Sequence, residues 1–228
     1  MLALFTLVQA YTLRVAHPAP SVQRAASCKM MVGYKEATAL APSACHALQS
    51  GTDADAGDAL SSCLSSAPAA RGFFELYLTG LEYECADAHA PPPVLMDYLL
   101  KAPLAVVDVL LMNVVTSAAA TISDERDGRT EVAENSERAG FRARILINAL
   151  WPSATELQES CDALKDAIRR ETEGFLPSAQ DQNYELLRDQ WSGILGFCDY
   201  DADQYIRIQK ALKLCGSVDG KVVPRKEA

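Results

Sequence analysis

Residues 104–122, with the sequence LAVVDVLLMNVVTSAAATI, form the most apolar stretch downstream of the N-terminal segment. Their length of 19 residues is close to that of a membrane-spanning helix. Asp108 would then lie within the hydrocarbon core, where insertion scales place its cost at about 2.5 to 3.5 kcal/mol. Asn113 and the hydroxyl residues that follow it weaken the apolar run further. The stretch therefore predicts a helix buried at the centre of a bundle, and a membrane-anchored subunit with a single span at 104–122 is the alternative.

The segments on either side of this stretch carry apolar residues at the three- and four-residue spacings of amphipathic helices. Proline and glycine separate these segments, and no stretch alternates in the manner of a strand. We expect an all-α, soluble bundle of about five to seven helices over residues 67–216. Residues 31–66, which are rich in Ala, Ser, Gly and Asp, are expected to be loosely structured, and residues 217–228 are expected to form a flexible basic tail.

The first 35 residues contain no acidic residue, and they begin with the short apolar run MLALFTLVQA. The run ends at Val8-Gln9-Ala10, which provides the compact residues that signal peptidase requires. The residues after Tyr11 are basic, hydroxylated and rich in alanine, as in a transit peptide. A signal-like segment, an aromatic residue and a transit-like segment in this order resemble the two-part leaders that direct proteins to the plastids of secondary endosymbiotic algae.

This resemblance implies that residues 1–30 are a cleaved targeting segment. It also implies that the protein resides in a complex plastid, in the stroma or in association with thylakoids. The apolar run lacks a preceding basic residue. A mitochondrial presequence, a plain secretory signal and an N-terminal helix that packs on the bundle are therefore alternatives.

The charge of the chain restricts its partners. The 30 acidic and 21 basic residues give a formal net charge of −9. Cleavage after residue 30 would remove three basic residues, which leaves 30 acidic against 18 basic residues and a charge of −12. Binding to nucleic acid requires a clustered excess of Lys and Arg. We therefore expect a protein complex as the partner and no nucleic acid.

A buried aspartate on so apolar a helix requires a partner, because an unpaired charge is costly to desolvate. The partner expected for Asp108 is Arg142, Arg144 or a ligand. Asp108, Asn113 and Arg142 are therefore candidate residues of a cofactor or small-ligand pocket. The alternative interpretation of Arg138, Arg142 and Arg144 is a solvated helix face, because glutamates lie close to them in the sequence.

Asp199, Asp201 and Asp203 alternate as in the first half of a calcium-binding loop. The sixth position of such a loop requires glycine but is Gln204, and the twelfth supplies a bidentate carboxylate but is Lys210. The three aspartates are thus weak metal candidates, and we expect no metal site. The favoured interpretation is a helix N-terminus whose acids face the positive end of the helix dipole.

The seven cysteines include no C-x-x-C pair, which excludes zinc-ribbon and thioredoxin-like motifs. Cys198 and Cys215 flank the last predicted helix and are candidates for a regulatory disulfide, which would suit a plastid. Cys161 and Cys215 also fall on apolar helix faces, where free cysteine behaves as a small buried hydrophobe.

The sequence lacks a glycine-rich phosphate loop, a GxSxG motif and an HExxH motif. Only His46 and His89 would remain after cleavage of the leader, so imidazole chemistry is poorly supplied. We nominate no catalytic residue and expect no cofactor. An enzyme is therefore not the favoured class.

The favoured function is that of an accessory or assembly protein that binds a stromal or thylakoid protein complex, and peripheral membrane association is left open. Four aromatic residues offer anchors for binding unless they lie in the core: Tyr83, Tyr98, Trp151 and Trp191. The alternative is a helical enzyme, or a protein that binds a pigment or small ligand, with its pocket near Asp108, Asn113 and Arg142.

Overall fold

The computed structural model describes residues 20–174, 181–218 and 221–222. Within these residues the chain is all-α, as its sequence predicts, with nine α-helices and one 3-10 turn. Two strands of two residues each, β1 (Ser217–Val218) and β2 (Lys221–Val222), pair antiparallel. The predicted targeting segment lies largely outside the described residues.

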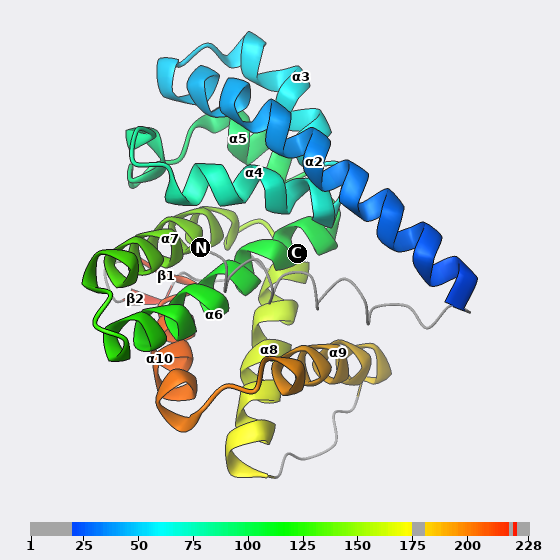
Figure 1. Ribbon diagram of the computed structural model, residues 1–228, viewed down its shortest axis with the longest axis vertical. Coiled ribbons are helices and arrows are strands. Elements are labelled where there is room, and N and C mark those ends of the chain that lie inside the picture. Colours follow the sequence, from blue (N-terminus) through cyan, green and yellow to red (C-terminus); the bar gives the residue numbers. More distant parts are fainter. Residues whose placement is uncertain (1–19, 175–180, 219–220, 223–228) are drawn as a thin grey trace.

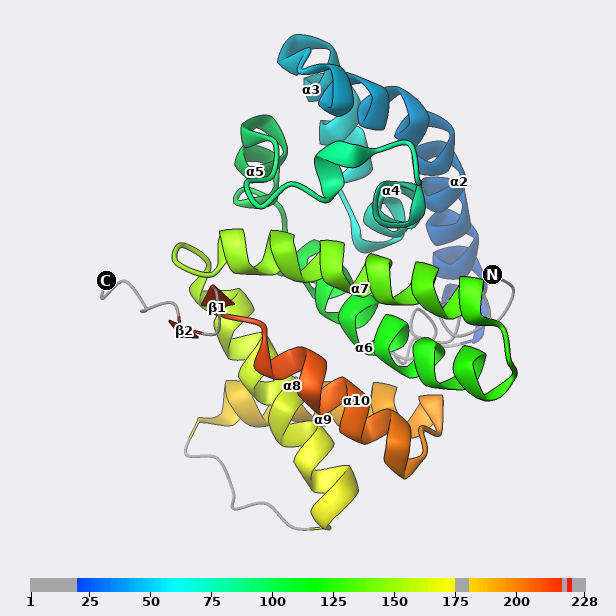
Figure 2. The ribbon, with the colours of Figure 1, turned by 90° about the vertical axis from the view of Figure 1, so that its left-hand side faces the viewer.

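The helices are arranged in three tiers (Figure 1, Figure 2). The upper tier consists of α2 (Pro20–Ser50), α3 (Asp53–Cys63), α4 (Ala67–Thr79), the 3-10 turn η1 (Glu84–Ala86) and α5 (Pro93–Leu99). The middle tier is the hairpin of α6 (Leu104–Arg126) and α7 (Thr130–Leu150). The lower tier consists of α8 (Thr155–Glu173), α9 (Gln182–Cys198) and α10 (Ala202–Lys213). Helix α4 packs on the middle tier from one side, and α8 and α10 pack on α6 from the other.

Helix α6 is the core helix of the bundle and begins directly after Pro103. Fifteen of its 23 residues are buried, because α4, α7, α8 and α10 surround it. Its length and composition would allow it to cross a membrane, and a buried core helix meets the same criterion. The prediction of a central core helix is confirmed, and the apolar character that suggested a membrane span is explained by packing within the protein.

The expectation that residues 31–66 are loosely structured is wrong, because α2 extends to Ser50 and α3 follows it. Helix α2 packs on α3 and α4, and the buried residues within its part 33–50 are Ala37, Ala41, Ala44, Cys45, Ala47 and Leu48. Most of these residues recur at the spacing of one helical face. Because alanine contributes little hydrophobicity, the helical period of apolar residues in α2 is weak in the sequence, although the face that these residues form is packed.

Both ends of α10 are attached to the middle tier. At its start Asp201 and Gln204 form a capping box, and Gln204 Nε2 donates a hydrogen bond to Ser123 Oγ of α6 at 3.0 Å. Beyond its end the N–H of Gly216 donates to Asn148 Oδ1 of α7 at 2.7 Å. These contacts fix α10 beside α6 and α7.

The expectation of a flexible tail over residues 217–228 is wrong for its first residues. Ser217 pairs with Val222, and Val218 pairs with Lys221. Gly216, with a φ of 80°, turns the chain into this pairing, in the left-handed region that favours glycine. Residues 219–220 and 223–228 lie outside the described residues.

Gly72→Ala is expected to lower the free energy of unfolding by about 1 to 2 kcal/mol, because α4 approaches the backbone of α2 at this position. A Cβ on Gly72 would lie 2.7 Å from Thr38 Oγ1 and 2.9 Å from the carbonyl oxygen of Tyr34, so α2 would have to move. Urea unfolding measures the effect.

Gly193→Ala in α9 is the matched control, because a Cβ at that helical position meets no atom within 4 Å. It is expected to raise the free energy of unfolding by roughly 0.5 to 1 kcal/mol through the helix propensity of alanine. Equal effects of the two substitutions would contradict this account of the packing of α4 on α2.

Candidate functional site

Asp108 of α6 is 4% exposed, and its partner is a hydroxyl group of α8. Ser160 Oγ donates a hydrogen bond to Asp108 Oδ1 at 2.6 Å, and Trp191 Nε1 of α9 donates to Ser160 Oγ at 3.1 Å. Burial raises the pKa of Asp108 to about 6, although the hydrogen bond from Ser160 opposes the shift. The expectation of an arginine or a ligand as the partner is therefore wrong: a chain of two hydrogen bonds joins α6, α8 and α9.

Arg142 is buried elsewhere, at the end of α4. Its Nε and Nη2 atoms each contact a carboxylate oxygen of Asp87 at 2.7 Å. Its Nη1 donates to the carbonyl of Gly80 at 2.7 Å and to those of Tyr77 and Leu78 at 3.3 Å. The interpretation of Arg142 as part of a solvated face is wrong, because the side chain is 1% exposed. Its hydrogen bonds lower the pKa of Asp87.

The three pocket candidates do not form one site. Asn113 Nδ2 donates to the carbonyl of Val109 in its own helix at 2.7 Å, while Asp108 and Arg142 bind separate partners. Neither of the two cavities described below is lined by any of the three residues. The geometry therefore offers no support for a cofactor pocket at Asp108, Asn113 and Arg142.

The three aspartates of the loop before α10 have structural roles. Asp199 ends α9 in the left-handed region, with a φ of 50°, and Asp201 caps α10. Asp201 and Asp203 both form ion pairs with Arg126 of α6. Among the described residues no cluster of three or more His, Cys, Asp or Glu side chains could hold a metal ion. The interpretation of this loop as a helix N-terminus is confirmed.

Cys198 and Cys215 are both free thiols. Contact with the Cys161 thiol, together with burial, raises the pKa of Cys215 well above its ordinary value. Burial likewise raises the pKa of Cys198, which lies beside Tyr200. A thiol with a raised pKa is a poor nucleophile, so the structure offers no reactive pair at these positions.

The aromatic residues expected as binding anchors belong to the core. Tyr83, Trp151 and Trp191 are buried, and Tyr98 is partly buried against the same core. Large apolar side chains are exposed at other positions, among them Ile206 and Leu214 at α10 and Leu186 of α9.

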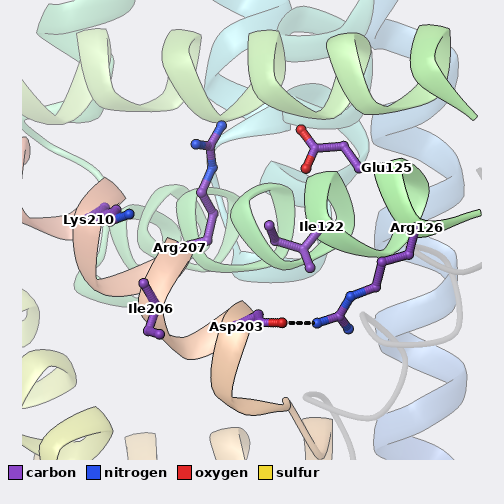
Figure 3. A pocket seen from close by; sticks show the side chains of 7 residues that line it. All are labelled: Ile122, Glu125, Arg126, Asp203, Ile206, Arg207 and Lys210. Carbon is purple, nitrogen blue, oxygen red and sulfur yellow. Dashed lines mark hydrogen bonds and ion pairs between the residues drawn. The ribbon is translucent and has the colours of Figure 1, made fainter. Parts of the chain in front are cut away.

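A groove of about 310 Å³ lies between α6 and α10 (Figure 3). It is lined by Ile122, Glu125 and Arg126 of α6 and by Asp203, Ile206, Arg207 and Lys210 of α10. Ile122 and Ile206 provide its apolar part, and Ile206 is 50% exposed. This groove is called the α10 groove below.

The charged residues of the α10 groove are only partly engaged with one another. Arg207 Nη2 pairs with Glu137 Oε1 of α7 at 2.7 Å, and Arg126 Nη2 pairs with Asp203 Oδ2 at 2.6 Å. Exposed ion pairs of this kind contribute little to stability because solvent screens them, so their arginines can exchange partners at little cost. Lys210 is exposed and has no ion-pair partner in the part of the chain that the structure describes.

A smaller cavity of about 130 Å³ adjoins the α10 groove and shares Arg207 and Lys210 with it. Its remaining walls come from α6 around Ser117 and from α7 around Gly140 and Arg144. This cavity is called the α7 cavity below.

The α10 groove was not among the sequence predictions, although a signal for it exists. Ile206, Lys210 and Leu214 recur every four residues, beside the buried face that contains Ile208 and Leu212. An isoleucine and a leucine on the polar side of an amphipathic helix mark a surface that the bundle does not cover.

A protein-family model described as "Uncharacterised conserved protein UCP020893" matches residues 33–214. The match covers more than half of the chain and includes every residue that lines the groove and the cavity. The chain therefore belongs to this family. No curated protein and no solved structure matches the chain.

Proposed function

We propose that this family member is a plastid accessory or assembly protein that binds another protein through the α10 groove. The observation that carries the proposal is the exposure of Ile206 beside Arg207 and Lys210, on a helix that the bundle holds at both ends. A solvent-exposed isoleucine next to two cations forms a surface whose burial by a partner would contribute favourable binding free energy.

The N-terminal segment supports the plastid location. Residues 1–30 resemble a two-part leader, and the family model begins at residue 33. The part of the chain that matches the family is therefore the part that would remain after cleavage of the leader.

The chemistry of the groove indicates the chemistry of the partner. Ile122 and Ile206 would bury an apolar side chain, and Arg207 and Lys210 would face its carboxylates. Charge complementarity of this kind orients a partner and excludes others. The proposed partner is therefore a protein segment that carries an apolar side chain next to acidic residues.

Ile206→Asp is expected to release the protein from its complex, because it places a carboxylate in the apolar part of the groove, where the apolar side chain of the partner would lie, and close to the partner's acidic residues. The full chain, wild type or variant, would be expressed with a tag in an alga that has a complex plastid, and isolated plastids would be compared by native electrophoresis. The wild type is expected in a complex above the monomer mass, and the variant at the monomer mass.

Leu186→Asp is the matched control, because Leu186 is 63% exposed on α9, outside the groove. This variant is expected to remain in the complex. The proposal fails if the wild type runs alone while other native complexes are intact, or if Leu186→Asp releases the protein and Ile206→Asp does not. Absence of the wild type from the plastid fraction would refute the plastid location. Native electrophoresis of the fraction that contains the protein would then test the binding surface.

A further inference from the structure

The α7 cavity gathers cationic side chains in an otherwise acidic protein. Arg144, Arg207 and Lys210 line it, and Glu137 is the single carboxylate among the lining residues that the structure describes. These four side chains carry a formal charge of +2, whereas the whole chain carries −9. The cavity is thus a local field of the opposite sign, and such a field attracts anions.

Arg144 is the most buried of the three cations that line the cavity. It is partly buried and has no ion-pair partner among the described residues; its guanidinium carbon lies 5.9 Å from the ring centre of Phe141. Burial lowers the pKa of Arg144, the charges of Cys215 and Glu137 oppose this shift, and the nearby Arg207 adds to it. The carboxylate of Glu137 is engaged with Arg207 at 2.7 Å. A partly desolvated guanidinium group whose neighbouring carboxylate is already paired with another arginine is unfavourable, and an anion in the cavity would relieve it.

Ser117 and Gly140 provide the floor next to this guanidinium group. A Cβ on Gly140 would lie 3.8 Å from both Arg144 Nη1 and Ser117 Oγ. Ser117 is itself a lining residue of the cavity. The same Cβ would lie only 3.1 Å from Ser117 Cβ, so Gly140 lets α7 approach α6 closely and brings the Arg144 guanidinium and the Ser117 hydroxyl to the same wall of the cavity.

We propose that the α7 cavity binds a phosphoryl group. A phosphate monoester carries a charge of about −1.5 to −2 at pH 7, which complements the charge of the lining side chains. Guanidinium groups bind phosphate oxygens through paired, charge-assisted hydrogen bonds. A site for one water needs about 10 to 15 Å³, so a cavity of about 130 Å³ has room for a much larger group. The inference concerns a different ligand from the protein partner of the α10 groove and does not rest on it.

Arg144→Gln is expected to weaken the binding of inorganic phosphate by about tenfold or more, because it removes the charge and the paired donors. Phosphate would be titrated into the purified full chain by calorimetry at constant ionic strength. Arg169→Gln is the matched control, since Arg169 is an exposed arginine of α8 outside the cavity, and it is expected to leave the affinity unchanged.

The proposal is overturned if the wild type shows no saturable binding of phosphate. It is also overturned if Arg144→Gln and the control Arg169→Gln weaken binding equally. Lys210→Gln is the second cavity variant. Because Lys210 is exposed, its substitution is not expected to impair folding, so this variant can still test the proposal if Arg144→Gln does not fold. It is expected to weaken binding, and an unchanged affinity would overturn the proposal.

The phosphoryl group has two sources, a small phosphate ester and a phosphorylated protein segment. Glycerol phosphate and a phosphoserine peptide distinguish them: the source is the one that binds more tightly, provided that Arg144→Gln weakens that binding. If the variant weakens neither, the proposal is wrong. Ile206→Gln, which removes the apolar side chain without placing a carboxylate beside Lys210, is expected to leave phosphate binding unchanged, so failure of this inference and failure of the proposed function are separable.

Discussion

Replacement of Arg142 by methionine is expected to lower the free energy of unfolding by about 3 to 5 kcal/mol, the cost of removing one partner from a buried charged network. The substitution leaves the carbonyl groups of Tyr77, Leu78 and Gly80 without their charged donor. The end of α4 would lose its attachment to α7. Chemical denaturation at neutral pH measures the effect.

Two further variants locate the source of this effect. Asp87 is 44% exposed but Arg142 is 1% exposed, so Asp87→Asn leaves a buried guanidinium group without its countercharge and is expected to cost about 1.5 to 3 kcal/mol. Arg138→Met is the control on the same helix, because Arg138 donates only to Asn135, and it is expected to change stability by about 0.5 kcal/mol or less. A loss from Arg142→Met no larger than that from Asp87→Asn would show that the carbonyl contacts contribute little.

Asp108→Asn is expected to stabilise the protein at pH 7 by about 1 to 3 kcal/mol. The carboxyl group has a pKa of about 6 in the folded protein and of about 3.9 in the unfolded chain. Between these values the folded state binds more protons, so the free energy of unfolding decreases as the pH rises through 6. The amide removes this penalty and still accepts the hydrogen bond from Ser160.

Denaturation curves collected from pH 4 to pH 7 test this prediction. The wild type is expected to lose stability between pH 4 and pH 6 relative to Asp108→Asn, whereas Asp58→Asn, at an exposed position of α3, is expected to follow the wild type. A variant at Asp108 that is less stable than the wild type at pH 7 would show that the hydrogen bonds through Ser160 to Trp191 require the ionised carboxylate.

Helices with strong local signals were predicted closely. Helix α6 begins at Leu104, the first residue of the apolar stretch that predicts it, and α7 ends at Leu150, two residues before Pro152. The apolar spacing of α4 continues through Leu81 to Cys85 and predicts a longer helix, yet α4 ends at Thr79 and Leu81 is exposed. The Arg142 side chain binds the carbonyls at this end of α4, and no local pattern reveals a contact from a helix more than 60 residues away.

In the candidate site, too, features with a local sequence signal were predicted, whereas contacts between residues distant in the chain were not. That Asp108 would be buried followed from the apolar sequence around it, but its partner Ser160 lies 52 residues away and is one of many hydroxyl residues. The environments of Arg142 and Arg144 could not be distinguished by their spacing. One lies under the end of α4 and the other lines the α7 cavity, because the neighbours of α7 differ along its length.

The double attachment of α10 affects the thermodynamics of association. Gln204 joins its start to α6, and Asn148 of α7 joins its far end through Gly216. A helix that is already immobilised loses little conformational entropy when a ligand or a partner binds. Ile206, Arg207 and Lys210 are thus presented in a pre-organised array, and more of the free energy of their contacts is available for affinity.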